Sequence, residues 1–182
     1  APRRTSVFRG SSQFATVAVE GNLLAAAGYD GLFFLDLADP AKPVLRGQTS
    51  VRYPEFREKA VAISGHHVFV TSSDDRSSNT GVMEVFDASD PASPQYVGAY
   101  EVPAVAWDVA VSGQLAVVTS YVPGGDTSFA DILDISDPAN PVRLALHTVI
   151  PGGPDIATVS LVDHYAILGG PRHHHDGRLL EH

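Results

Sequence analysis

A short segment that occurs three times constrains the fold of this chain more than any other feature. Its copies read LDLADPAKP, FDASDPASP and LDISDPANP, and they span Leu35–Pro43, Phe86–Pro94 and Leu133–Pro141. Each copy ends an apolar, β-prone run with an aspartate and then closes with an Asp-Pro turn. A segment repeated in this way indicates a repeat protein, in which similar structural units stack on one another.

The units around these segments share one pattern of short strands. Four β-prone runs, separated by Gly or Asp-Pro turns, make up each unit, which is the pattern of an antiparallel meander. The aspartate of the Asp-Pro turn recurs after 51 and then 47 residues, from Asp39 to Asp90 and on to Asp137. A period of about 40–50 residues with four strands predicts an all-β fold, a β-propeller of four-stranded antiparallel blades.

We expect a single domain over residues 1–182, with blades at about 14–50, 59–101, 107–149 and 155–182. The last unit lacks a fourth strand, and residues 4–10 resemble one. Pairing the two would close a ring of four blades and leave no open sheet edge. Alternatively, the chain is half of a larger propeller that a second copy completes. Both a monomer and a homodimer are therefore compatible with the sequence.

Composition excludes several classes of partner. The formal net charge is −9, which disfavours nucleic acid and anionic lipid as ligands. No apolar run approaches the roughly 18 residues that a membrane span needs. The chain has no cysteine, which removes disulfides and thiolate metal sites. It opens with Ala1 rather than Met, as a chain does after loss of a secretory signal or after laboratory alteration.

The repeat resembles the LVIVD repeat family. The residues that carry the resemblance are Trp107–Gly113, Ile132–Pro141 and the "IVD" triplets that end at Asp36, Asp87 and Asp134. The resemblance implies β-propeller blades of bacterial or archaeal extracytoplasmic or cell-surface proteins, and no single activity. One departure concerns an aspartate early in the first strand of each unit. Only Asp108 retains it, whereas the other units have Thr16, Ala60 and Thr158.

An up-and-down meander places its connections on two faces. The Gly turns and the Asp-Pro turns are short and lie on one face, which we call the regular face. The second-to-third-strand loops and the links between units lie on the other, which we call the irregular face. Irregular loops on a rigid scaffold commonly carry binding sites. We therefore expect a ligand to bind at the irregular face.

Four residues at the mouth of that face are candidate ligand-binding residues. They are Tyr53, Trp107, Asp108 and Tyr121, and such an aromatic cup suits a protein segment or a glycan. The aspartates Asp36, Asp87 and Asp134 recur once per unit, which indicates a structural role. We expect their carboxylates to accept backbone N–H bonds from the adjoining turn.

A histidine-rich loop is the candidate metal site. Its residues His173, His175 and Asp176 are of the types that bind zinc. Asp74 and Asp75 lie in another loop of the irregular face, where calcium is conceivable, although the alternating acids of a dedicated loop are missing. The pair His66-His67 follows a Gly turn on the regular face. We expect that pair to be a solvated surface turn, apart from the histidine-rich loop.

These residues favour a non-enzymatic binding module, and the resemblance implies that it works outside the cytoplasm. The sequence contains no G-x-S-x-G, P-loop, G-x-G-x-x-G or H-E-x-x-H motif, and no catalytic residue can be assigned. The alternative is a metal-dependent hydrolase or lyase, with a divalent ion (Zn or Ca) at the mouth of the irregular face. A third possibility is a purely structural segment of a larger propeller.

Overall fold

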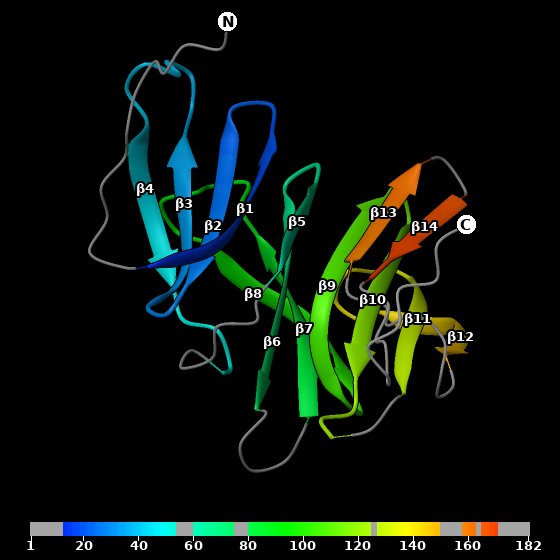
Figure 1. The fold of residues 1–182 in the computed structure, drawn as a ribbon. Coiled ribbons are helices and arrows are strands. Elements are labelled where there is room, and N and C mark those ends of the chain that lie inside the picture. The colour runs from blue at the N-terminus through cyan, green and yellow to red at the C-terminus, as the bar shows by residue number, and fades with distance from the viewer. Residues whose placement is uncertain are drawn as a thin grey trace, which may run out of the picture.

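A computed structural model describes residues 13–53, 60–74, 80–124, 127–149, 158–162 and 165–170. These residues form fourteen strands and no helix. The strands make three four-stranded antiparallel sheets and one two-stranded sheet, which lie side by side in chain order (Figure 1). The predicted all-β fold of four-stranded antiparallel blades is confirmed. None of the described residues belongs to a helix that is long and apolar enough to cross a membrane.

We number the sheets as blades in chain order. Blade one contains β1 (Phe14–Glu20), β2 (Leu23–Gly28), β3 (Gly31–Asp36) and β4 (Val44–Thr49). Blade two contains β5 (Val61–Ser64), β6 (His67–Asp74), β7 (Thr80–Asp87) and β8 (Gln95–Val102). Blade three contains β9 (Val105–Ser112), β10 (Leu115–Tyr121), β11 (Ser128–Asp134) and β12 (Val142–Val149). The described part of blade four contains β13 (Thr158–Val162) and β14 (Tyr165–Gly169).

A left-handed glycine closes the first hairpin of each of the first three blades. Gly21, Gly65 and Gly113 have φ angles of +56°, +62° and +58°. A Cβ at any of them would meet open space, so it is the backbone conformation that calls for glycine. Each of these glycines lies in a two-residue loop, which keeps the paired strands in register.

Two other glycines lie where neighbouring blades pack against each other. A Cβ on Gly47 in β4 would overlap the carbonyl oxygen of Pro91, and one on Gly98 in β8 would overlap that of Ala139. Pro91 and Ala139 belong to the Asp-Pro turns of blades two and three. The repeated turn of one blade therefore packs directly on the outer strand of the blade before it. Blade three has Ala145 at the corresponding position of β12.

Most of the hydrophobic core lies between the blades. The inner strands β1, β5, β9 and β13 contact one another in that order. Phe34 of blade one packs with Val68 and Val70 of blade two, and all three side chains are fully buried. A second cluster joins blades two and three, and a third joins blades three and four. Each fully buried Val or Phe contributes about 1.5–3 kcal/mol of stability, so the blade interfaces hold the fold together.

Among the described residues, the inner strand of blade one is more exposed than the inner strands of blades two and three. Val17 and Val19 of β1 are 57% and 55% exposed, whereas Val61 and Val109, which correspond to Val17, are 8% and 5% exposed. Within the described residues, no cluster joins β13 to β1. The residues predicted to close the ring, 4–10 and 178–182, lie outside this part of the chain.

Candidate functional site

Trp107 occupies a β-bulge at the start of β9. Thr119 of β10 pairs with Asp108 and the next residue, Ser120, pairs with Ala106, so Trp107 is the extra residue of the bulge. A bulge bends its strand and re-aims the side chain that it carries. The Trp107 side chain is 38% exposed, which is a large exposed fraction for the only tryptophan of the chain. Blade one has a similar bulge, and the residue there is Ala15.

The residues on both sides of Trp107 are bonded to other blades. The hydroxyl of Ser73 in blade two accepts the Ala106 N–H at 2.8 Å and donates to the Ala106 carbonyl at 3.2 Å. The second oxygen of Asp108, Oδ2, accepts the N–H of Val159 in blade four at 2.9 Å. Trp107 is therefore held between two cross-blade anchors, which limits its movement before any ligand arrives.

Tyr121, the last residue of β10, completes an aromatic pair with Trp107. The two ring centroids are 5.1 Å apart and the ring planes meet at 72°, an edge-to-face contact. Tyr53 lies elsewhere, on the link that leaves blade one. Its neighbour Arg52 binds Glu84 and Glu101 on the outer strands of blade two. Among the described aromatic contacts, Tyr53 has none with Trp107.

Asp108 bridges two blades. Its Oδ1 accepts the N–H of Val109 at 2.8 Å, and its own N–H donates to the Thr119 hydroxyl at 3.1 Å. Together with the bond from Val159, both carboxylate oxygens accept backbone N–H groups. The carboxylate therefore orders the backbone beneath the aromatic pair. Sequence reasoning missed this bridge because Val159 lies in another blade, 51 residues away.

The recurring aspartates play the structural role that the sequence predicts. Asp36, Asp87 and Asp134 each accept the N–H of the residue two positions later, at 2.8, 2.7 and 2.8 Å. This backbone bond is the main cause that lowers the pKa of Asp87 and Asp134 below the ordinary value of 3.8. For Asp36 the main cause is a hydrogen bond from Arg46. The prediction of backbone N–H bonds is confirmed in all three blades.

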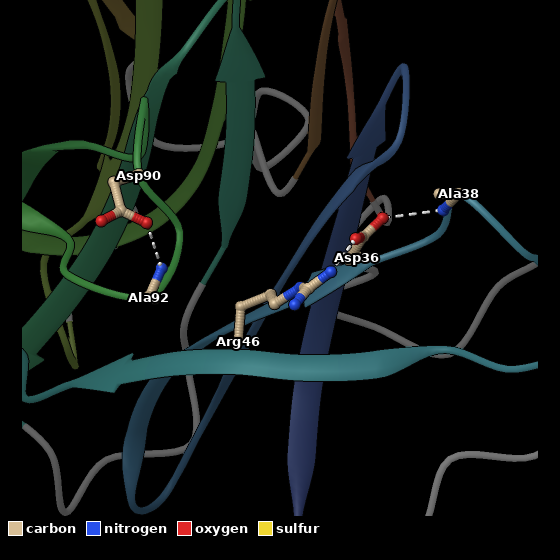
Figure 2. Close-up of polar contacts among 5 residues, drawn as sticks. All are labelled: Asp36, Ala38, Arg46, Asp90 and Ala92. Carbon is tan, nitrogen blue, oxygen red and sulfur yellow. Dashed lines mark hydrogen bonds and ion pairs between the residues drawn. The ribbon is translucent and has the colours of Figure 1, made fainter.

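The structure describes a cavity of about 410 Å³ on the regular face, where blade one meets the Asp-Pro turn of blade two. Its lining includes Asn22, Leu23, Asp36, Arg46 and Asp90. Arg46 forms an ion pair with Asp36 at 2.6 Å, and Asp90 Oδ1 accepts the N–H of Ala92 at 3.0 Å (Figure 2). The ligand site was predicted at the irregular face, and this hollow on the regular face was not predicted, because the Gly and Asp-Pro turns that form it are short.

His66 and His67 lie beside the carboxylate of Asp87. One nitrogen of each imidazole and one oxygen of Asp87 lie within 4.8 Å of one another. From the sequence, the pair was predicted to be a solvated surface turn. Strand register is the signal that could have revealed this cluster, because Asp87 ends the strand that pairs with the strand of His67. The predicted metal ligands His173, His175 and Asp176 lie outside the described residues, as does Asp75.

Two buried acids that the sequence analysis did not single out join blades at the third strand. Glu84 accepts the N–H of Arg52 at 2.7 Å, and burial raises its pKa. Asp131 is 1% exposed and accepts the hydroxyl of Tyr100, from blade two, at 2.8 Å. Burial and then this bond raise the pKa of Tyr100 to about 12. Both acids are used in packing one segment on another.

Comparison with known proteins bears on the repeat and the fold. Residues 59–102 and 104–145 match the family model of the LVIVD repeat, and they coincide with blades two and three. The fold is similar to the crystal structure of the computationally designed Ika4 protein, with 14% sequence identity, a TM-score of 0.63 and 93% of each chain covered. The designed Ika8 protein matches at 10% identity and a TM-score of 0.45, over 85% of this chain and 54% of that one.

No curated protein sequence matches this chain. At 14% identity, the likeness to Ika4 concerns the fold alone. The repeat match and the stacked antiparallel sheets agree with each other and with the resemblance carried by the IVD triplets. Blades two and three of this chain are LVIVD repeats, and the chain has the blade architecture of a β-propeller.

Proposed function

We propose that this protein is a non-enzymatic interaction module that binds a protein segment on the aromatic pair Trp107–Tyr121. The observation that carries the proposal is the placement of Trp107, an exposed tryptophan on a bulge between two anchored residues. Tryptophan and tyrosine are enriched among the residues that dominate binding energy at protein interfaces. A platform that is already rigid loses little conformational entropy when a ligand binds.

Charge indicates which segments bind best. The chain has a formal net charge of −9, so its field attracts basic segments and repels acidic ones. The face of a tryptophan ring also attracts the cation of a lysine or arginine. We therefore propose a segment that is neutral or basic. The family resemblance supports a place of action outside the cytoplasm, at a cell surface or in the periplasm.

Trp107 is the only tryptophan, so its fluorescence reports on this site alone. The chain should be probed against an array of unstructured peptides of graded charge and, in parallel, an array of glycans. We expect basic peptides to bind and to change the Trp107 emission. Tyr121→Ala should weaken that binding at least about tenfold, the loss of 1.4 kcal/mol that a central aromatic residue commonly exceeds.

Tyr96→Ala is the matched control, since Tyr96 is an aromatic residue that is 55% exposed on the outer strand β8. This variant should bind as the unaltered chain does. Peptide binding that survives both Trp107→Ala and Tyr121→Ala would refute the proposed site. Binding of glycans but not peptides would keep the site and change the class of partner.

A further inference from the structure

Two imidazoles and a carboxylate converge at the corner of blade two, on the regular face. His66 lies in the two-residue turn between β5 and β6, His67 begins β6, and Asp87 ends β7. Their ligand atoms lie within 4.8 Å of one another. In the part of the chain that the structure describes, this is the only group of three metal-ligating side chains so close together.

Backbone hydrogen bonds hold the three residues in place. His67 and Asp87 face each other across the β6–β7 pairing. The N–H of Ala88 donates to the carbonyl of His66 at 2.8 Å, which ties the turn to the end of β7. The two imidazole centroids are 4.3 Å apart. Only side-chain rotation is then needed to bring the three ligand atoms onto one ion.

Asp87 keeps lone pairs that can bind a cation. Its Oδ1 accepts the N–H of Ser89 at 2.7 Å. A carboxylate has about four lone-pair sites, so this bond leaves Asp87 able to bind a cation.

The corresponding corner of blade one has other chemistry. Asn22 and Leu23 take the places of the two histidines. Arg46 binds the carboxylate of Asp36 at 2.6 Å and neutralises it. No metal ligand other than Asp36 remains among these positions.

Blade two has Val97 where blade one has Arg46. Among the described residues, no lysine or arginine forms an ion pair with Asp87. Compared with blade one, this corner of blade two has gained two histidines and has a valine in place of the arginine. Both changes favour a cation, one by adding ligands and the other by removing a competing charge.

We propose that His66, His67 and Asp87 bind one divalent transition-metal ion of the zinc class. In a tetrahedral zinc site with bonds of about 2.0–2.1 Å, neighbouring ligand atoms are roughly 3.3 Å apart. Rotation of the exposed His66 ring and the half-buried His67 ring closes the remaining gap, and water takes the fourth position. Imidazole nitrogens favour zinc over calcium or magnesium, which prefer oxygen ligands. The ion would cross-link the β5–β6 turn to β7.

Zinc titration of the full chain, by calorimetry and equilibrium dialysis, tests this site. His173, His174 and His175 also offer imidazoles, so two variants are compared. One is the double variant His66→Asn with His67→Leu, which installs the residues of blade one. The other replaces His173, His174 and His175 by alanine. We expect the first to lose one bound zinc and the second to keep that zinc.

Cobalt gives a second readout, since a tetrahedral Co²⁺ site with nitrogen ligands absorbs visible light. The absorption should persist in the His173–His175 variant and vanish in the double variant. His66→Asn alone, at an exposed turn position, should weaken zinc binding at least about tenfold, the loss that removing even a hydrogen-bond partner of a ligand causes. Circular dichroism without metal checks that each variant folds. Unchanged zinc stoichiometry and affinity in both His66 variants would overturn the proposal, as would loss of all zinc binding in the His173–His175 variant.

Discussion

The corners of blades one and two are built on the same backbone and present different chemistry. In both, an aspartate that ends the third strand accepts the N–H two residues later, Asp36 from Ala38 and Asp87 from Ser89. In both, the outer strand carries a glycine against the next Asp-Pro turn. At the surface of the corner, blade one has an arginine paired with its aspartate, whereas blade two has two histidines beside its own.

The difference separates two kinds of constraint on a repeated unit. Positions that the backbone of blades one and two needs, such as Asp36 and Gly47 with their counterparts Asp87 and Gly98, are the same in these two blades. Positions whose side chains face solvent vary, because the strand pairing does not depend on them. A function that is specific to one blade is therefore expected where the solvent-facing side chains of that blade differ from those of the others while the backbone is the same.

The largest effect is expected where the two corners agree. Gly98→Ala places a methyl group against the carbonyl oxygen of Ala139, and Gly47→Ala does the same against Pro91. We expect each to lower the free energy of unfolding by about 1–3 kcal/mol, the usual cost of overpacking. Urea denaturation measures it.

Ala145→Gly is the control for these glycines, because blade three has alanine at the same position of β12. It should cost only about 0.5–1 kcal/mol, from the greater backbone freedom of glycine in a strand. If Gly98→Ala were no more destabilising than this control, the close packing of turn on strand would not hold.

A transplant should move the chemistry of blade two to blade one. The triple variant Asn22→His, Leu23→His and Arg46→Val gives Asp36 the same neighbours as Asp87. We expect a second zinc to bind, at least about tenfold tighter than to the unaltered corner, or 1.4 kcal/mol. Calorimetry in the His173–His175 background measures it. A triple variant that folds and gains no zinc would show that the shared backbone is not enough to set the ligand geometry.

The smallest effect concerns pH. Arg46 is the main cause that lowers the pKa of Asp36, whereas the Ser89 amide is the main cause for Asp87. Arg46→Val should therefore raise the pKa of Asp36 toward 3.8 and leave that of Asp87 unchanged. NMR titration of the side-chain carboxyl carbons measures both.

The direction in which stability changes with pH follows from the coupling of proton binding to folding. A carboxyl whose pKa is lowered by folding contributes stability above its unfolded value of about 3.8, and that stability is lost as the pH falls through the lowered value. In Arg46→Val the loss below pH 3.8 should be shallower than in the unaltered chain. High salt should shrink the difference, because the pair is exposed. Equal acid unfolding of the two proteins would contradict the role given to Arg46.

Local features of the fold and the site were predictable from the sequence. The bond from each recurring aspartate spans two residues, so the motif itself contains both partners. The strands follow from β-prone runs between turns. Trp107 lies near the start of one strand and Tyr121 ends the adjacent strand of the same blade, which is why they were grouped together and are in contact.

Features that depend on two distant segments were not predictable in the same way. Asp108 bonds to Val159 across a blade interface, and no spacing in the chain indicates that contact. Gly98 is required by a turn that lies in the next blade. The cluster of His66, His67 and Asp87 was visible only through strand register, since His67 and Asp87 are 20 residues apart in sequence but opposite one another in the sheet.

The glycines that receive the Asp-Pro turns give the repeat array a place where it can lengthen. Blade two has both a turn that packs on a glycine and a glycine that accommodates a turn. Its Asp-Pro turn packs on Gly47 of blade one, and its own Gly98 accommodates the Asp-Pro turn of blade three. A duplicated copy of blade two would therefore fit between the original and blade three. A copy inserted after blade three would meet Ala145, whose methyl group occupies the space that the turn needs. This packing therefore favours lengthening of the array between blades two and three over lengthening after blade three.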